Sequence, residues 1–377
     1  MDWRVPLADL DYGTEEEAAV LGVLRSKWLT MGAVTQQFEQ EFGRAVGAKH
    51  AFSVSNATEA LHLACLVLGI GPGDEVITPS LSFVATSNAV LYTGAEVRFA
   101  DVCGAQDLTI DPLDIERKIT PRTKAIIVMH YGGYPCHMAE ILAVAARHGL
   151  EVIEDAAHSP GAALQGKALG SWGALGCYSF FSNKNLSTGE GGMIVTDRDE
   201  LAEKIRLMRS HGMTTLTYDR HKGHAYSYDV VELGYNYRID EIRSALGLEQ
   251  LKKLPRNNAL RGEWVRLYRA ELADAGLEIP FTAAAGLPAY HLMPVLLPQG
   301  LERKAVIDRM RADRIQTSIH YPPTHTFQYY QGRFGAVSLP VTEDLAAREL
   351  TLPLYPSMGE EAVRAVTESL KQAMLRS

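Results

Sequence analysis

A carboxylate and a lysine, each placed just after an apolar run, have the clearest chemical potential in this chain. Asp155 lies in V-I-E-D-A-A-H at residues 152–158, and His158 closes that segment. Lys184 lies in Y-S-F-F-S-N-K-N-L at residues 178–186, ahead of a glycine-rich stretch. A carboxylate in such a position can cap a helix or pair with a buried cation. A lysine there is normally solvated, but beside a desolvating wall its amine can attack a carbonyl.

Two more segments could supply a phosphate site and an aromatic ring. In S-N-A-T-E-A-L at residues 55–61, a strand passes into a helix whose first N–H groups would hold a phosphate. The plain alternative is an ordinary helix N-cap, which this pattern alone favours. Phe83 follows a strand in P-S-L-S-F at residues 79–83. Taken alone, such a phenylalanine is more often a core residue than a ring stacked on a cofactor.

The combination of these residue types matches the needs of one cofactor. In open α/β sheets, ligands bind outside the carboxyl ends of the strands, where all four segments would lie. A phosphate cradle, an aromatic face, a buried carboxylate and a lysine together fit pyridoxal phosphate. That cofactor requires a lysine for its carbonyl and an aspartate beside its pyridine nitrogen. The prediction rests on the coincidence of the four signals in one chain.

A large sheet must position these segments. Between about residues 45 and 200, short β-rich apolar runs alternate with helical patterns, which predicts an α/β domain with helices on the faces of the sheet. Helical apolar spacing over residues 58–68 and 138–147 fits crossover helices. The expected strands are residues 51–54, 75–78, 97–100, 125–129, 152–154, 177–181 and 193–196.

A second, smaller domain is expected after Pro255. A helix is predicted from about Asp240, and its apolar face ends before Pro255. We therefore predict a large domain over residues 1–254 and a small C-terminal α+β domain over residues 255–377. The pieces expected in the small domain are helices around 259–275, 301–312 and 360–375 and an apolar run over 291–297.

Composition limits the class of protein. The 377 residues are 46% hydrophobic and 22% charged, which is typical of a globular protein. Lys and Arg total 37 and Asp and Glu total 45, so the net charge of −8 argues against nucleic-acid binding through a basic surface. The four cysteines lie far apart without zinc-site spacing, so we expect buried free thiols and no metal. We find no signal peptide and no membrane-spanning run, and therefore expect a cytoplasmic protein without a membrane partner.

One phosphate-binding motif is present only in part. Residues 161–168 match G-x-x-x-x-G-K but end in Ala168, where a hydroxyl must bind Mg²⁺. Gly166 and Lys167 lie between short extended segments, which favours a hairpin turn instead. No G-x-G-x-x-G follows a strand, so a Rossmann nicotinamide site is disfavoured.

Several longer segments occur in an order shared with one known family. They are S-N-A-T-E-A-L-H-L-A, G-P-G-D-E-V-I-T-P-S-L-S-F-V-A-T, V-I-E-D-A-A-H, Y-S-F-F-S-N-K-N-L and L-G-Y-N-Y-R, followed by T-S-I-H-Y-P-P and L-P-L-Y-P. In these segments the chain resembles the sugar nucleotide aminotransferases of the DegT/DnrJ/StrS family, from about residue 5 to the C-terminus. The resemblance implies a fold type I pyridoxal phosphate enzyme. Its large domain would hold a seven-stranded mixed sheet beside a small C-terminal domain, and two copies would form a homodimer with shared active sites.

The resemblance also implies roles for individual residues. Lys184 matches the lysine that forms the internal aldimine with pyridoxal phosphate, and Asp155 matches the carboxylate that keeps the pyridine nitrogen protonated. His320 and Tyr321 fall in the segment that approaches the sugar. The other matched positions are Ala57, Thr58 and Ser179 as phosphate ligands, Phe83 stacked on the ring, His158 near the phenolic oxygen, and Asn236 as a phosphate contact from the other subunit.

The implied reaction moves an amino group from glutamate, through pyridoxamine phosphate, to a nucleotide-linked keto sugar. V-I-E-D-A-A-H and H-Y-P-P resemble members that aminate C4, so we expect a 4-keto-6-deoxyhexose in deoxyamino sugar biosynthesis, for polysaccharides or antibiotics. Amination at C3 is the alternative within the family. A pyridoxal phosphate-dependent sugar dehydratase, in which histidine replaces the lysine, and a non-catalytic sensory or binding protein are further alternatives. The presence of Lys184 argues against the former, and that of Lys184 and Asp155 against the latter.

Overall fold

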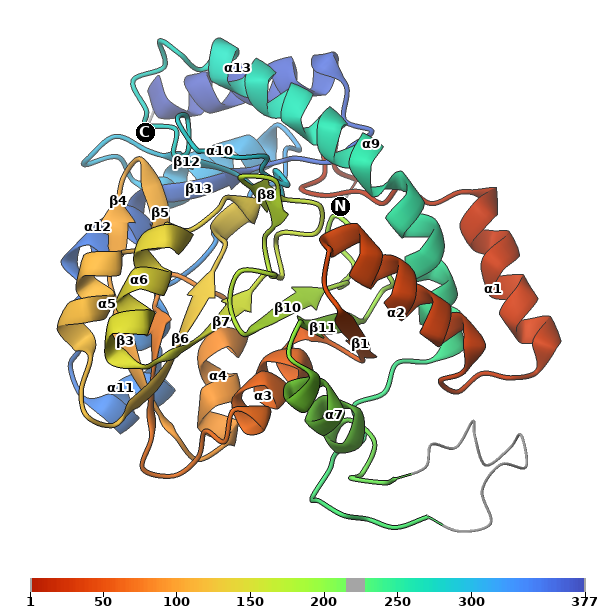
Figure 1. The fold of residues 1–377 in the computed structure, drawn as a ribbon. Coiled ribbons are helices and arrows are strands. Elements are labelled where there is room, and N and C mark those ends of the chain that lie inside the picture. Colours follow the sequence, from red (N-terminus) through yellow and green to blue (C-terminus); the bar gives the residue numbers. More distant parts are fainter. Residues whose placement is uncertain (1, 215–227, 376–377) are drawn as a thin grey trace.

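A seven-stranded sheet forms the centre of this computed structural model, which describes residues 2–214 and 228–375 (Figure 1). Each strand predicted between residues 45 and 200 is present, with ends that differ by one or two residues. The expected α/β class with a mixed sheet is confirmed. The strands lie in the order β1-β11-β10-β7-β6-β2-β3. Their bounds are β1 His50–Val54, β2 Glu75–Pro79, β3 Glu96–Ala100, β6 Thr123–Met129, β7 Glu151–Asp155, β10 Leu175–Ser179 and β11 Gly192–Thr196.

The strand directions bring the polar strand ends together. β7 runs parallel to β6 and β10, and β2 runs parallel to β3 and β6. β11 is antiparallel to both of its neighbours, β1 and β10, so β1 and β10 share one direction. The carboxyl ends of β1, β2, β7 and β10 and the amino end of β11 therefore lie along one edge of the sheet. Ligands of such sheets bind at this edge.

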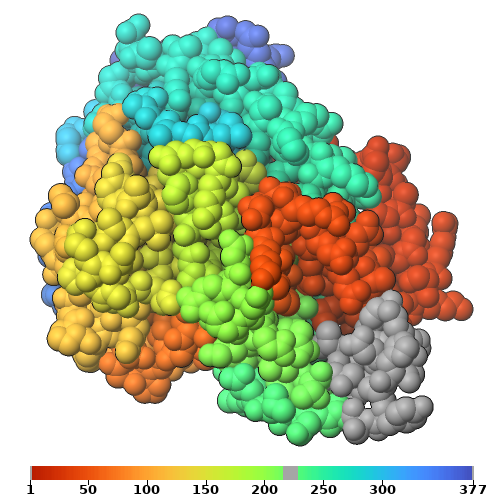
Figure 2. All heavy atoms as spheres, viewed as in Figure 1, coloured from red at the N-terminus to blue at the C-terminus, as the bar shows by residue number. Residues whose placement is uncertain are grey.

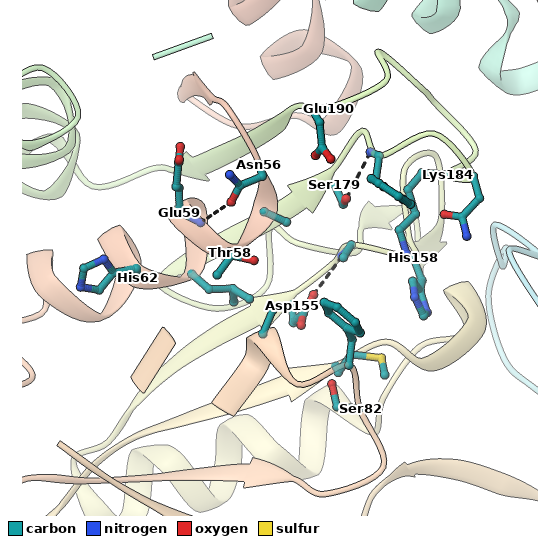
Figure 3. A pocket seen from close by; sticks show the side chains of 18 of the residues that line it. Asn56, Thr58, Glu59, His62, Ser82, Asp155, His158, Ser179, Lys184 and Glu190 are labelled. Carbon is teal, nitrogen blue, oxygen red and sulfur yellow. Dashed lines mark hydrogen bonds between the residues drawn. The ribbon is translucent and has the colours of Figure 1, made fainter. Parts of the chain in front are cut away.

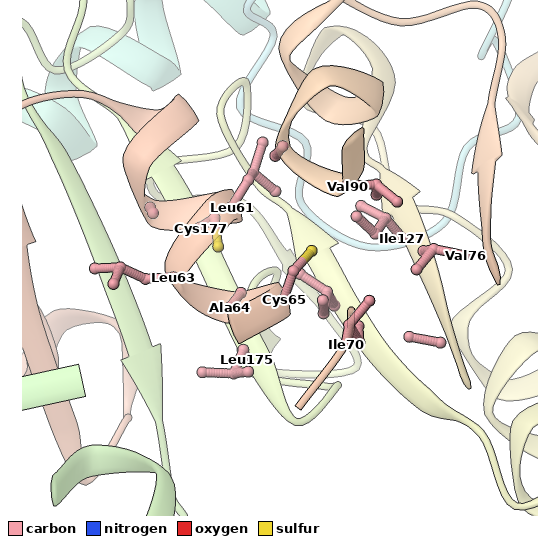
Figure 4. Close-up of a cluster of buried hydrophobic side chains, with 14 of the residues drawn as sticks. Leu61, Leu63, Ala64, Cys65, Ile70, Val76, Val90, Ile127, Leu175 and Cys177 are labelled. Atoms are coloured by element: carbon pink, nitrogen blue, oxygen red, sulfur yellow. The ribbon is translucent and has the colours of Figure 1, made fainter. Parts of the chain in front are cut away.

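Alternating side chains of the buried strands fill a hydrophobic layer on each face of the sheet. In β6, Ala125 and Ile127 belong to one layer, and Ile126 and Val128 belong to the other. Figure 4 shows part of the first layer, between α3 and strands that include β6 and β10. The helices over the first layer are α3 (Ala57–Val67), α4 (Ala85–Tyr92) and α7 (Asp199–Met208), and those over the second are α5 (Pro112–Lys118) and α6 (Met138–His148).

Two helices that the sequence analysis did not predict precede the sheet. α1 (Thr14–Ser26) and α2 (Ala33–Val46) pack against α9 (Glu241–Glu271), which comes much later in the chain. Figures 1 and 2 show these red helices beside the teal-green one. Gly247 of α9 makes the close packing possible, because a Cβ there would lie 2.5 Å from the ring of Phe38 in α2.

The predicted helix end before Pro255 is wrong, because α9 continues through this residue. A proline removes one backbone hydrogen bond from a helix interior. Packing compensates on both sides of it: α9 contacts α1 and α2, and it also contacts α13 (Glu360–Leu375). Leu254 and Asn257, which flank the proline, are both buried. The proposed division of the chain between residues 254 and 255 thus falls inside one helix, and it stays a prediction.

A second hydrophobic core lies around the C-terminal elements. β12 (Met293–Leu296) and β13 (Glu349–Leu352) pair antiparallel. α10 (Arg303–Ala312) and α13 contribute to the same core. Val5, near the N-terminus, is buried in this core and bridges to Ile315. The α+β character expected for the C-terminal region is therefore present, with a short contribution from the start of the chain.

The partial phosphate-binding motif forms a hairpin, as predicted. β8 (Ala163–Leu164) and β9 (Lys167–Ala168) pair antiparallel, and the two turn residues, Gln165 and Gly166, both have positive φ. The remaining elements are β4 (Val102–Gly104), β5 (Asp107–Ile110), 3-10 turns at Tyr131–Gly133 and Thr324–Thr326, α11 (Gln328–Phe334) and α12 (Pro340–Arg348).

The cysteines are free thiols, but one of them was misjudged. Cys65, Cys136 and Cys177 are buried as expected. Cys103 is exposed, because β4 belongs to a separate two-stranded hairpin and not to the central sheet. Among the described residues, no helix has both the length and the apolar character needed to cross a membrane.

Candidate active site

A cavity of about 680 Å³ opens at the edge where the strand ends meet. In Figure 3, Asn56 and Thr58 lie on one side of it, Lys184 and His158 lie on the other, and Asp155 lies between them. Every residue to which the family resemblance gave a cofactor or substrate role, except Asn236, lines this cavity: Ala57, Thr58, Phe83, Asp155, His158, Ser179, Lys184, His320 and Tyr321.

One end of the cavity is the start of α3. Asn56 caps this helix, and its side chain accepts a hydrogen bond from a first-turn N–H at 2.9 Å. The first N–H groups of a helix have no partner within the helix, so those of Ala57 and Thr58 remain for a ligand. Ser179, at the end of β10, adds a hydroxyl. Gly192 lets β11 start close by, since a Cβ there would lie 2.6 Å from the carbonyl carbon of Asn56. This end is suited to a phosphate.

Of the two carboxylates at the end of β7, Asp155 lines the cavity and Glu154 does not. Successive strand residues point to opposite faces of a sheet. Glu154 accepts hydrogen bonds from the N–H groups of Gly170, Trp172 and Gly173 on the other side. It therefore fixes the loop after β9.

The carboxylate of Asp155 is buried and is oriented by two hydrogen bonds. Its Oδ2 accepts from the Thr86 hydroxyl at 2.7 Å, and its Oδ1 accepts from the Ala157 N–H at 3.1 Å. Burial raises the pKa of Asp155, while these hydrogen bonds and the positive charge of Lys184 act in the opposite direction. A cationic ring nitrogen in the cavity would add a further favourable partner.

Lys184 lies in the loop after β10, and its Nζ is 3.5 Å from Nε2 of His291. Burial lowers the pKa of Lys184 to about 8, although the negative charge of Asp155 opposes that shift. An amine with this pKa is partly unprotonated near neutral pH. Lys184 can therefore act as a nucleophile toward a carbonyl.

His158 contacts both the backbone of Gly132 and the side chain of Tyr321. Its Nδ1 accepts a hydrogen bond from the Gly132 N–H at 3.2 Å, and its Nε2 lies 2.9 Å from Oη of Tyr321. Burial and the nearby charge of Lys184 lower the pKa of His158 well below its usual value. Tyr321 also meets Phe83, with 6.0 Å between the ring centroids. The rings of Phe83 and Tyr321, which are far apart in sequence, thus both line the cavity.

His320 is held by β13. Its N–H donates to Oε2 of Glu349 at 2.8 Å, and its Nδ1 lies 2.8 Å from Oγ1 of Thr351. Burial lowers the pKa of His320 to about 3 and raises the pKa of Glu349 to about 7. His320 is therefore a neutral group in the lining of the cavity. The sequence analysis missed Glu349.

Asn236 does not reach the cavity of its own chain. It is exposed, and its backbone bridges to Ser210. An exposed position agrees with the expected role in the site of a second subunit, which stays a prediction.

Nearly the whole chain matches one protein family. Residues 11–371 match the model of the DegT/DnrJ/EryC1/StrS aminotransferase family. The chain belongs to this family. The resemblance seen in the sequence is thereby confirmed, and the protein is a pyridoxal phosphate-dependent sugar aminotransferase, as predicted.

Individual relatives cover nearly all of the chain. The spore coat polysaccharide biosynthesis protein SpsC of Bacillus subtilis is 42% identical over 367 residues, which is 95% of this chain and 94% of SpsC. PseC of Helicobacter pylori, an aminotransferase of pseudoaminic acid biosynthesis, has a TM-score of 0.92 at 31% identity, with 100% of both chains covered. Spr1654 of Streptococcus pneumoniae, a proposed sugar aminotransferase solved in its PMP form, has a TM-score of 0.94 at 25% identity, with coverage of 99% and 100%.

Residues that support the enzyme's two central side chains were missed in the sequence. Thr86 binds the carboxylate of Asp155; it ends one of the segments shared with the family, but no role was predicted for it. Asn185 follows Lys184 directly, and His291 opens the apolar run over residues 291–297, which contains β12. Both could have been noticed as polar residues at the border of apolar segments, but their contact with each other depends on packing.

Proposed function

We propose that this enzyme transfers an amino group from glutamate to a nucleotide-linked 4-keto-6-deoxyhexose, using pyridoxal phosphate attached to Lys184. The observation that carries the proposal is the placement of three groups in one cavity. Lys184 lies on one side, the N-terminus of α3 with Thr58 lies on the other, and the buried carboxylate of Asp155 lies between them (Figure 3).

The lining residues fit the cofactor group by group. Ala57, Thr58 and Ser179 offer N–H and hydroxyl donors for a phosphate. Asp155 offers an oriented carboxylate for a ring nitrogen. Phe83 is 56% exposed in the single chain and presents its ring to the cavity, so it is available to stack on a planar ligand.

The chemistry assigned to the chain's own residues is proton transfer and charge stabilisation. Bound pyridoxal phosphate supplies a carbonyl that binds amines and a ring that accepts electron density. Asp155 keeps the ring nitrogen protonated through its negative charge. Lys184 would hold the cofactor through its carbonyl, and its free amine would carry the proton removed from the donor's Cα.

Glutamate and the sugar acceptor come from the family resemblance, and the relatives support a sugar. SpsC acts in spore coat polysaccharide biosynthesis, and PseC is an aminotransferase of pseudoaminic acid biosynthesis. The acceptor assigned here is a ketone at C4, because V-I-E-D-A-A-H and H-Y-P-P resemble the C4 members. The homodimer, with Asn236 reaching the partner's site, and the cytoplasmic location are part of the same proposal.

A panel of keto sugar nucleotides, each offered with glutamate, tests the acceptor. We expect release of 2-oxoglutarate with 4-keto-6-deoxyhexoses, and an amine at C4 of the product by NMR. The same panel with Lys184→Ala is the control and is expected to give no release. A product aminated only at C3 would overturn the C4 assignment. Absence of transfer to every keto sugar would overturn the proposed function.

A further inference from the structure

A series of buried side chains, linked by hydrogen bonds, leads from α9 to Lys184. Asn258 in α9, Asn185 and His291 are all buried. Nδ2 of Asn258 donates to the carbonyl of Pro160 at 2.9 Å, and Nδ2 of Asn185 donates to Oδ1 of Asn258 at 2.8 Å. Nδ1 of His291 lies 3.0 Å from Oδ1 of Asn185, and its Nε2 lies 3.5 Å from Nζ of Lys184.

Two backbone carbonyls fix the direction of every hydrogen bond in this series of side chains. A carbonyl oxygen only accepts, so the carbonyl of Pro160 requires the NH₂ group of Asn258. In the same way the carbonyl of Ala289, 2.7 Å from Nδ2 of Asn185, requires the NH₂ group of Asn185. Oδ1 of Asn185 therefore faces Nδ1 of His291, which must carry the hydrogen.

The tautomer of His291 follows from this direction. A neutral imidazole has one N–H and one lone pair, so Nε2 presents its lone pair to Lys184. Burial and the neighbouring positive charges, of which that of Lys184 is the largest, lower the pKa of His291 well below its usual value. The backbone N–H of His291 donates to the carbonyl of Gly132 at 2.8 Å and anchors the residue. The ring can accept a hydrogen bond from the lysine and is not a source of protons for it.

We propose that His291 is a positioning residue for Lys184. It accepts a hydrogen bond from the lysine amine whenever that amine is detached from the cofactor, and Asn185 and Asn258 hold it in the accepting tautomer. The amine then keeps a defined place while it carries a proton at the substrate's Cα. This inference rests on the proposed function, which makes Lys184 the reactive amine.

Two substitutions of His291 form a matched pair. His291→Gln can place an amide oxygen near the position of Nε2, whereas His291→Asn can keep the hydrogen bond to Asn185 but ends short of Lys184. Both variants remove the imidazole ring, so any effect of lost packing is common to the two. We expect kcat to fall roughly tenfold more in His291→Asn than in His291→Gln, with a smaller change in the KM for glutamate.

The reactivity of Lys184 in the cofactor-free, full-length chain gives a readout apart from turnover. Reductive methylation with formaldehyde and cyanoborohydride consumes the unprotonated amine, and mass spectrometry of the Lys184 peptide follows its rate against pH. Loss of the acceptor disfavours the protonated amine, so the midpoint should fall by about half to one pH unit in His291→Asn and by less in His291→Gln. The other titratable groups that interact with Lys184, which are Asp155, His158 and His320, stay unchanged in both variants.

Equal pH midpoints and equal kcat values in the two variants would overturn the positioning role. If His291→Asn does not fold, Asn185→Ala tests the same point, because it removes the acceptor of the Nδ1–H. A wild-type pH midpoint in Asn185→Ala would overturn the tautomer assignment. Failure of the proposed function is distinguishable, because Lys184 would then remain unlabelled when the wild-type enzyme with pyridoxal phosphate is reduced with borohydride.

Discussion

Oη of Tyr321 lies 2.9 Å from Nε2 of His158, whose other ring nitrogen is already engaged by the Gly132 N–H. Because Nδ1 accepts, Nε2 must carry the hydrogen and donate it to the tyrosine oxygen. The hydroxyl hydrogen of Tyr321 is thereby directed to another acceptor, and the side chain lines the cavity. Burial raises the pKa of Tyr321, so its hydroxyl stays protonated at working pH.

Tyr321→Phe should therefore remove a hydrogen-bond donor from the site and leave its shape intact. We expect kcat to fall roughly tenfold, because losing the free energy of one hydrogen bond in the transition state slows a reaction by about that factor. Tyr92→Phe is the matched control, because Tyr92 also lines the cavity but is 58% exposed. Steady-state kinetics of both variants decides, and equal effects would contradict a special role for Tyr321.

Asp155→Asn should remove the negative charge proposed to stabilise the ring nitrogen, while keeping the side chain's size. Breaking a buried charge pair costs about 3 to 5 kcal/mol, so we expect kcat to fall by roughly 10²- to 10³-fold or more. Thr86→Val removes only one hydrogen bond to the carboxylate, and a loss of roughly tenfold or less is expected. Kinetics that show the larger loss for Thr86→Val would contradict the assignment of Asp155.

Lys184→Met should stabilise the cofactor-free chain. The folded-state pKa of Lys184, about 8, lies below its ordinary value of 10.5, so the unfolded chain binds more protons between these values. Lys184 therefore lowers the free energy of unfolding by its full amount below about pH 8, and this destabilisation disappears as the pH rises past 10.5. We expect a rise in Tm of a few degrees at pH 7 that shrinks with increasing pH.

Thermal unfolding of the variant and the wild type across this pH range measures the effect. Lys124→Met is the control, because Lys124 is exposed and its replacement should leave Tm unchanged. A gain for Lys184→Met that stays constant up to pH 11 would show that it comes from packing and not from the charge.

A hybrid dimer should recover activity if Asn236 completes the partner's site. Lys184→Ala and Asn236→Ala chains, co-expressed with different affinity tags and purified through both, form dimers in which one site carries both changes and the other carries neither. By symmetry we expect about half of the wild-type activity per dimer. Activity no higher than the mean of the two parent homodimers, assayed at limiting pyridoxal phosphate, would show that the sites are not shared.

The sheet could be predicted because each of its strands is a short apolar run with a polar end. A parallel arrangement then gathers those ends, so Asp155, Lys184 and Thr58 could be placed in one site from order alone. Continuity of α9 through Pro255 could not be predicted, because a proline normally ends a helix and the packing that holds this one comes from distant segments. The N-terminal helices were missed as well. α2 buries Phe38 and Phe42 in a cluster that includes Tyr178 of β10 and Leu254 of α9, and among the apolar residues of α1 only Val23 is buried.

The supporting contacts of the site also depend on tertiary packing. Asn258, Asn185 and His291 come from three separate segments, and only the fold brings their side chains within hydrogen-bond distance. Asn236 shows a different limit. Its expected partner lies in another subunit, so neither the pattern of one chain nor its single-chain fold defines the contact.

Reduction with borohydride tests most directly whether Lys184 carries the cofactor. With pyridoxal phosphate added, we expect the purified protein to show a visible absorbance band that borohydride abolishes. Mass spectrometry should then find the reduced phosphopyridoxyl group on the Lys184 peptide, and Lys184→Ala should show neither the band nor the label. A label on another lysine, or a band that persists in Lys184→Ala, would contradict the assignment.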